Sequence, residues 1–248
     1  MYGIMSNRGV DSMSKLKYLL PIRLIMFILI FVIGSIIVNK NISDISNWWS
    51  IVATIVNLVT ILILVLVCKK MNISYSKLIN YEKGKTKLKE VIEISLIVLV
   101  LVSVGMNVAG LICYGVFPYL APMMAGPIPL VLAIINFLLL PLTVSFAEDG
   151  LYLGCGVNSF KNKYLSVLAP AFFYALQHSF IPVLFDAKYI LYRFLSFLPL
   201  TIIFCFYYSK KKNPVPIMIG HAIVEIASVV LVLVTSISPQ IYQSWLSM

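Results

Sequence analysis

Residues 146–156 read FAEDGLYLGCG, and this stretch decides how the rest of the chain is interpreted. Two adjacent acids, Glu148 and Asp149, follow a run from Ile128 onward that carries no other charge. The whole chain of 248 residues holds only nine acids. A carboxylate at the centre of a membrane helix costs at least ~2.5 kcal/mol. We therefore expect either a functional site inside the membrane or a helix end that the interface hydrates.

The composition is that of a polytopic membrane protein. Hydrophobic residues make up 61% of the chain and charged residues 11%, whereas soluble domains carry about 25% charged residues. The formal charge of +10 does not indicate a nucleic-acid partner, because the basic residues cluster between apolar runs. The predicted partner is the lipid bilayer. The cysteines are far apart and show no CxxC spacing, so we expect free thiols.

The apolar runs predict an all-α fold with about seven transmembrane helices and a cytoplasmic N-terminus. The first run lacks a small-residue cleavage site, so it is read as a retained helix. With this orientation, sixteen of the nineteen basic residues fall on the cytoplasmic side, in agreement with the positive-inside rule. The predicted spans are 18–38, 48–68, 94–116, 130–157, 164–185, 189–208 and 215–237.

The predicted organisation has four parts. They are a cytoplasmic N-terminal segment (1–17), two helices with a basic cytoplasmic loop (18–89), a membrane core (90–237) and a short tail (238–248). The stretch 69–93 holds seven lysines and predicts a loop with a short amphipathic helix. It is either a topology determinant or a surface for anionic lipid or a substrate tail. The proline-rich stretch 117–129 predicts a non-helical external loop.

The only two histidines, His178 and His221, both fall inside predicted spans. Each alone is compatible with an interhelical hydrogen bond, but two histidines together with buried acids favour a common site. At 1.5 Å per residue, His221 lies ~12 Å, Glu148 ~15 Å and His178 ~22 Å from the cytoplasmic surface. A later start of the fifth span, or a tilt, would bring the three residues level.

Spacing by four residues places further groups beside these three on the same helix faces. Tyr152 accompanies Glu148, Tyr174 accompanies His178, and Glu225 accompanies His221. A buried carboxylate suits a general base, and a histidine suits proton transfer or donation to an oxyanion. One glutamate and two histidines also suit a metal, although no HExxH occurs.

The ordered set resembles the CPBP family of intramembrane endopeptidases, which comprises the CAAX prenyl proteases and the bacteriocin-immunity (Abi) group. That family carries EExxxR, FxxxH and HxxxN in successive helices. The corresponding stretches here are EDGLYL (148–153), YALQH (174–178) and HAIVE (221–225). The resemblance covers about residues 90–230. It implies that Glu148 and His178 activate a water molecule and that His221 polarises the scissile carbonyl. It implies no cofactor and leaves open whether a divalent metal takes part.

The sequence departs from the family pattern at four supporting positions. Asp149 replaces the second glutamate, and Leu153 replaces the arginine that would neutralise it. An acid buried without its cation must be protonated, hydrated or paired elsewhere. Tyr174 replaces phenylalanine, and Glu225 replaces an asparagine. An ionised Glu225 would repel an oxyanion, or would instead hold His221 as an imidazolium donor.

The resulting hypothesis is an intramembrane hydrolase that cleaves a membrane-associated peptide or protein. Its cavity is expected to open to the cytoplasm, and a multi-pass bacterial plasma membrane protein is expected from the lysine-rich, arginine-poor composition. Peptide maturation and bacteriocin self-immunity are the roles considered. Two alternatives are a non-catalytic immunity or scaffold protein, and a small proton-coupled transporter that uses Glu148 and Asp149. The transporter is disfavoured because no internal repeat is visible.

Overall fold

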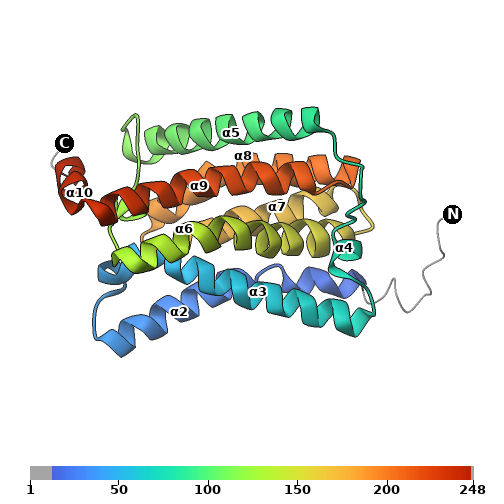
Figure 1. Ribbon diagram of the computed structural model, residues 1–248, viewed down its shortest axis with the longest axis horizontal. Helices are drawn as coiled ribbons and strands as arrows, with labels where there is room; N and C mark the ends of the chain where they lie inside the picture. Colours follow the sequence, from blue (N-terminus) through green and yellow to red (C-terminus); the bar gives the residue numbers. More distant parts are fainter. Residues whose placement is uncertain (1–12, 247–248) are drawn as a thin grey trace.

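The computed structural model describes residues 13–246, in which every regular element is a helix (Figure 1). The predicted all-α membrane fold is confirmed. The long helices are α2 (Ile22–Val38), α3 (Trp49–Met71), α5 (Leu88–Tyr114), α6 (Leu130–Val144), α7 (Leu165–His178), α8 (Ala187–Lys211) and α9 (Val215–Ile237). The shorter helices are η1 (Leu16–Leu19), η2 (Ile42–Trp48), α4 (Tyr75–Leu78), η3 (Pro122–Ala125), η4 (Ser145–Val157) and α10 (Pro239–Leu246).

Six segments of the described chain are long and apolar enough to cross a membrane. The remaining long helix, α7, corresponds to the fifth predicted span. It has only 14 residues, fewer than the ~20 that a span needs. The predicted span 164–185 is therefore wrong beyond His178, where the helix ends. Pro182 explains this end, because proline disfavours helical backbone at the residue before it and lacks the N–H that a helix requires. Irregular backbone completes this pass as far as α8.

The helices run back and forth along one common direction, and the continuous rod formed by α6 and η4 lies at the centre. This rod contacts α3 on one side and α9 on the other, and η4 also contacts α7 and α8. Helix α5 lies at the edge of the bundle, on α8 and α9 (Figure 1). The centre of the bundle is therefore the element that carries Glu148 and Asp149.

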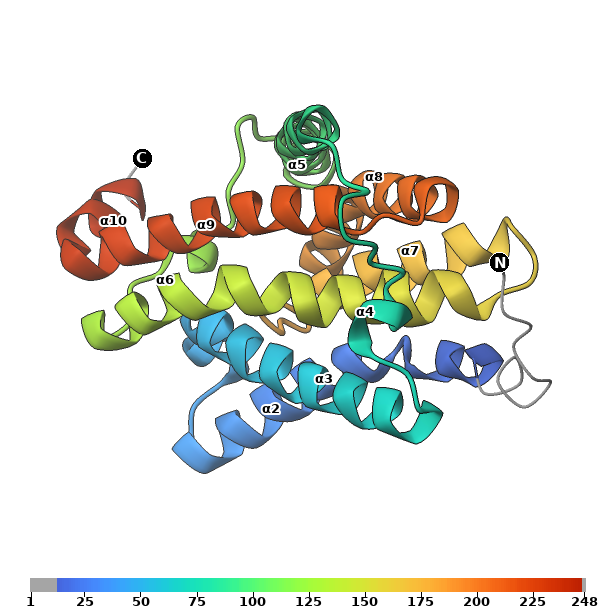
Figure 2. The same ribbon diagram turned by 45° about the vertical axis from the view of Figure 1, so that its right-hand side comes forward.

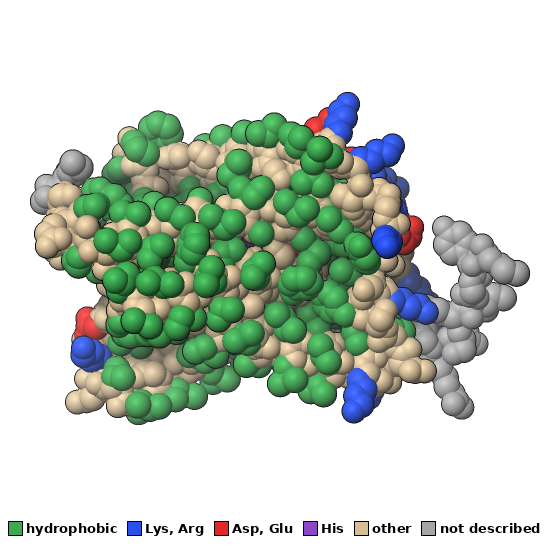
Figure 3. Space-filling view, viewed as in Figure 1, with side chains coloured by type: hydrophobic (Ala, Val, Ile, Leu, Met, Phe, Trp, Pro, Cys, Tyr) green, Lys and Arg blue, Asp and Glu red, His purple; other side chains and the backbone are tan. Residues whose placement is uncertain are grey.

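The face shown in Figure 3 has a broad apolar belt, and basic side chains gather at one end of it. We call this the lysine-rich end; α2, α5, α7 and α9 begin there. Two arginines of the charge count, Arg23 and Arg193, fall inside predicted spans. Arg23 is 0% exposed and Arg193 is 3% exposed, so neither acts as a topology determinant. The orientation of the bundle in the membrane stays a prediction.

The predicted loops have more structure than expected. In the stretch 69–93, the short helix is the single turn α4, and Leu78 and Ile79 are buried against η4. In the stretch 117–129, the turn η3 buries Ala121 and Ala125. Most of the predicted tail is the helix α10. Residues 1–12 of the predicted N-terminal segment and residues 247–248 lie outside the described residues.

Two glycine contacts determine the course of α5. A Cβ at Gly220 of α9 would lie 3.2 Å from the Cα of Ser95, so the two helices touch near the lysine-rich end. Farther along α5, a Cβ at Gly105 would lie 2.3 Å from the backbone oxygen of Ser196 in α8. Helix α5 therefore crosses from α9 towards α8, and Figure 2 shows it nearly end-on while α9 runs across the view.

We predict that Gly105→Ala destabilises the protein, because the added methyl group cannot be accommodated against the Ser196 carbonyl without moving a helix. Overpacking of this kind costs about 1–3 kcal/mol. The measurement is the unfolding temperature of the purified protein in detergent. Gly34→Ala is the matched control, because its added Cβ would make an ordinary 3.6 Å contact with Ile45. Equal unfolding temperatures for the two variants would contradict the proposed helix contact.

Candidate active site

The two acids lie on a π-helix. Helix α6 continues at Ser145 into η4, which is a π-helix of 13 residues. Its hydrogen bonds join residues five apart, so each turn holds more residues than in an α-helix, and consecutive side chains diverge less. Glu148 and Asp149 consequently face the same interior region, where they are 3% and 0% exposed. Such π segments are frequent at functional sites, and the sequence reading did not anticipate this one.

Close contacts with neighbouring elements support the π-helix. The hydroxyl of Tyr75 in α4 donates a 2.7 Å hydrogen bond to the carbonyl of Phe146. This approach depends on Gly150, because a Cβ there would lie 2.5 Å from the same hydroxyl oxygen. The hydroxyl of Ser145 donates to the backbone oxygen of Met218 in α9, at 2.8 Å. The glycines of the FAEDGLYLGCG stretch thus allow close packing around the acids.

Arg23 of α2 forms a buried ion pair with Glu148. Its Nη2 lies 2.7 Å from Glu148 Oε1. Three further acceptors complete the shell of the guanidinium: Gln177 Oε1 at 2.6 Å, Asn57 Oδ1 at 2.8 Å and Thr60 Oγ1 at 3.0 Å. Arg23 was counted only among the sixteen basic residues of the predicted cytoplasmic side, so this role was not predicted. A basic residue inside the first predicted span was the available signal.

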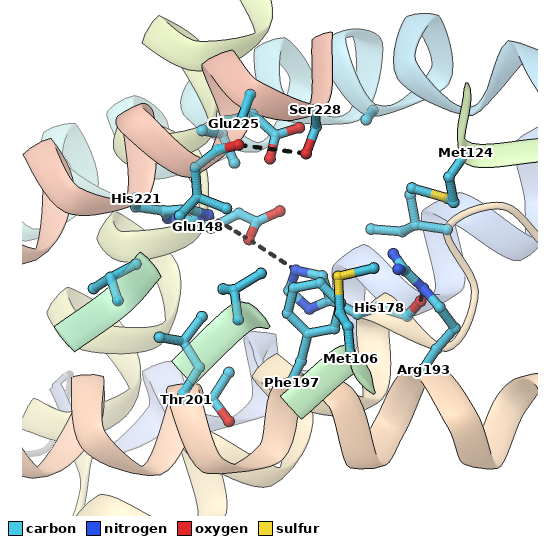
Figure 4. A pocket seen from close by; sticks show the side chains of 18 of the residues that line it. Met106, Met124, Glu148, His178, Arg193, Phe197, Thr201, His221, Glu225 and Ser228 are labelled. Carbon is cyan, nitrogen blue, oxygen red and sulfur yellow. Dashed lines mark hydrogen bonds and ion pairs between the residues drawn. The ribbon is translucent and has the colours of Figure 1, made fainter. Parts of the chain in front are cut away.

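The second oxygen of Glu148 faces both histidines. Glu148 Oε2 lies 3.9 Å from His178 Nε2 and 3.8 Å from His221 Nε2 (Figure 4). It is buried and has no hydrogen-bond partner within the described residues. The structure therefore brings together the three residues that were predicted to form one site. Polar atoms at this separation are suited to sharing a water molecule.

The orientation of His178 is fixed by its own helix. Its Nδ1 lies 2.8 Å from the backbone oxygen of Tyr174. Since a carbonyl oxygen only accepts, Nδ1 must carry the proton, and in the neutral ring Nε2 presents a lone pair to the site. The ring also stacks on Phe197, with centroids 4.0 Å apart. His178 is thus a rigid acceptor beside Glu148.

Asp149 and Tyr174 hold His221. The hydroxyl of Tyr174 donates to Asp149 Oδ1 at 2.9 Å and lies 3.1 Å from His221 Nδ1. His221 Nδ1 also lies 3.4 Å from Asp149 Oδ2. This arrangement turns Nε2 of His221 towards Glu148. Asp149 is therefore paired elsewhere, with a histidine and a tyrosine, while Leu153 lies in the apolar core.

The remaining predicted supporting residues have different positions. Tyr152 stacks on Tyr174, with ring centroids 4.4 Å apart, and its hydroxyl donates to Gln177 Oε1 at 3.1 Å. It therefore reinforces the shell of Arg23. Glu225 lies one turn beyond His221 and lines the cavity, but no hydrogen bond or ion pair within the described residues joins these two. Asp149 occupies the place beside His221 that was considered for Glu225.

A cavity of about 350 Å³ adjoins these side chains. It extends from Glu148 to Trp49 and Met124, away from the lysine-rich end. The sequence predicted an opening towards the cytoplasm. If the lysine-rich end is the cytoplasmic one, the cavity does not open there, because an apolar core around Tyr152 and Tyr208 fills that half of the bundle. Among the residues that line the cavity, Leu99, Ser103 and Ala227 are exposed on the outside of the bundle. The cavity thus opens sideways between α5 and α9, where these helices diverge.

Within residues 13–246, no group of three or more His, Cys, Asp and Glu side chains is arranged to hold a metal ion. All four cysteines are buried free thiols. The acids, histidines and arginine that line the cavity are Glu148, Glu225, His178, His221 and Arg193.

Comparison with known families agrees with this geometry. Residues 130–227 match the Rce1-like family model, type II CAAX prenyl endopeptidase Rce1-like. The match is consistent with the CPBP resemblance and confirms it. Comparisons with curated proteins and with solved structures give no match. The matched region contains Glu148, His178 and His221, covers less than half of the chain, and leaves out the helix that carries Arg23.

We predict that Arg23→Gln destabilises the protein more than the double substitution Arg23→Gln/Glu148→Gln. Removing one partner of a buried ion pair leaves an uncompensated charge and costs about 3–5 kcal/mol, whereas removing both partners is much less costly. Thermal unfolding of the wild type, both single variants and the double variant in detergent gives this coupling. Additive effects of the two substitutions would show that the pair contributes no interaction energy.

Proposed function

We propose that this protein is an intramembrane endopeptidase that hydrolyses a peptide bond in a membrane-associated peptide or protein. The observation that carries the proposal is the arrangement around Glu148. One of its oxygens is fixed by Arg23 at 2.7 Å; the other has no hydrogen-bond partner among residues 13–246 and faces the Nε2 atoms of two histidines. A positioned carboxylate with a free oxygen is the group that a general base requires.

In the proposed reaction, Glu148 Oε2 and His178 Nε2 hold the attacking water. Its oxygen attacks the scissile carbonyl carbon while Glu148 accepts the proton. His221 donates from Nε2 to the oxygen that becomes negative, and Asp149 stabilises the positive charge of the imidazolium from the opposite side of the ring. When the C–N bond breaks, Glu148 returns the proton to the leaving nitrogen. Each proton and bond is then accounted for without another reactant.

The sideways opening supports a substrate that lies in the bilayer. The gap between α5 and α9 faces the apolar belt, so a peptide dissolved in lipid reaches Glu148 without crossing the lysine-rich end. The biological roles that we favour are the maturation of a secreted peptide and immunity to a bacteriocin that the same cell produces. Both would take place in a bacterial plasma membrane.

We predict that Glu148→Gln abolishes cleavage of a membrane-inserted peptide, because glutamine cannot accept the proton of water. General-base catalysis is worth about 10²–10⁴-fold in rate, so the residual rate should fall by at least 100-fold. His178→Ala and His221→Ala should have similar effects. The assay uses purified protein in lipid nanodiscs with a library of apolar peptides and mass-spectrometric detection of products, with and without a chelator.

Glu90→Gln is the matched control, because Glu90 lies near the surface of α5 and pairs with Lys211. It should cleave like the wild type. Undiminished cleavage by Glu148→Gln would disprove the assigned mechanism. Retention of an immunity phenotype by Glu148→Gln and His178→Ala would instead identify a non-catalytic immunity or scaffold protein.

We also predict that Glu225→Asn increases the cleavage rate. Glu225 lines the cavity one turn from His221 and presents a carboxylate where the family pattern has an amide. An asparagine would add a hydrogen-bond donor at the developing oxyanion, and one such donor is worth about 10²–10³ in kcat. An increase of at least tenfold in kcat is expected in the same assay. An unchanged or lower kcat would show that Glu225 does not lie near the reacting oxygen.

A further inference from the structure

Arg193 is the second buried arginine, and it lies in the same cavity as Glu148. It comes from α8 and is 3% exposed. Its Nε donates a 3.2 Å hydrogen bond to the backbone oxygen of His178, and its guanidinium carbon lies 4.8 Å from the centroid of the Phe197 ring. These two contacts hold the stem of the guanidinium and leave its two terminal nitrogens directed towards the cavity (Figure 4).

The partners of the two buried arginines differ sharply. Arg23 has a carboxylate and three neutral acceptors. Arg193 makes no ion pair with any acid of residues 13–246, and its one hydrogen bond to a protein acceptor there is the bond to His178. A buried charge without a counter-charge costs several kcal/mol. Glu148 and Glu225 line the same cavity, but neither forms an ion pair with Arg193. The terminal nitrogens of Arg193 therefore border the cavity without a protein acceptor among the described residues, which suits an anionic ligand.

The place of this site relative to Glu148 suits substrate binding. Figure 4 shows Arg193 on the far side of His178 from Glu148, beside Met124. Apolar side chains, including Met106 and Phe197, line the wall between them. Because Glu148 and Arg193 line one cavity, a chain that enters between α5 and α9 can contact both residues at once.

We propose that Arg193 is a binding subsite for a carboxylate of the substrate peptide, and that it fixes which peptide bond is presented to Glu148. This inference rests on the proposed peptidase function. Arginine favours this ligand because its planar fork matches the two oxygens of a carboxylate. A cavity of about 350 Å³ is at the small end of ligand pockets. It therefore suits the end of a peptide, whose carboxylate is the terminal one.

The test is a binding measurement on the full-length Glu148→Gln protein in nanodiscs of neutral lipid. Fluorescently labelled apolar peptides are compared by anisotropy with a C-terminal carboxylate, with a C-terminal amide, and with an amide plus a final aspartate. We expect the free carboxylate to bind at least tenfold more tightly than the plain amide, as charged hydrogen bonds imply. The aspartate peptide separates a side-chain carboxylate from a terminal one.

Arg193→Gln should remove the difference between carboxylate and amide while leaving amide binding unchanged, and Arg193→Lys should keep part of it. Lys188→Gln is the matched control, because it removes an exposed charge at the same end of the bundle and outside the cavity. It should keep the full difference. Equal binding of all three peptides would overturn the proposal. Binding of anionic lipid at Arg193 that carboxylate peptides do not displace would also overturn it, because the site would then bind a lipid phosphate.

This measurement does not depend on cleavage. A protein that discriminates the peptides but cleaves none of them would refute the peptidase function and keep the Arg193 subsite. A protein that cleaves carboxylate and amide peptides equally, in wild type and in Arg193→Gln, would keep the function and refute the subsite.

Discussion

The ion pair between Arg23 and Glu148 is the interaction on which the rest of the site depends. It joins η4, the second half of the central rod, to α2, the first long helix of the bundle, which is far from η4 in sequence. Because both charges are buried, each must be matched by the other and by hydrogen bonds. The shell that does this draws on α3 through Asn57 and on α7 through Gln177. The base is thus positioned by four helices at once.

The pair also explains how the chain tolerates Leu153. The family pattern provides its arginine on the same helix as the acids, whereas here the cation comes from α2 and contacts Glu148 instead of its neighbour. Asp149 is free to bond with Tyr174 and His221. The helices α2 and α3 lie outside the matched region 130–227, yet they supply part of the shell around the base. The N-terminal helices are therefore structural components of the site.

Much of the fold was predictable, because apolar runs of about twenty residues report membrane passes directly. The grouping of Glu148, His178 and His221 was predictable for a similar reason, since ionisable groups inside a membrane need one another. Three features were not. The sequence analysis paired side chains four residues apart, as in an α-helix, whereas the hydrogen bonds of the π-helix join residues five apart. Arg23 and Arg193 lie near the ends of predicted spans, where the sequence does not show whether a side chain points into the bundle or towards the interface. The short α7 was concealed by the apolar residues that follow it.

The way in which α5 leans from α9 onto α8 has a further consequence. Gly105 and Gly220 allow the two close contacts that leave the cavity open to the side of the bundle. Ligands reach a cavity with such a lateral opening by diffusing within the plane of the bilayer. The occupancy of the cavity then depends on the number of ligand molecules per lipid molecule. Lipid acyl chains compete with the ligand for the same cavity. Dilution of the membrane with inert lipid should then slow the encounter, whereas dilution of the surrounding water should not.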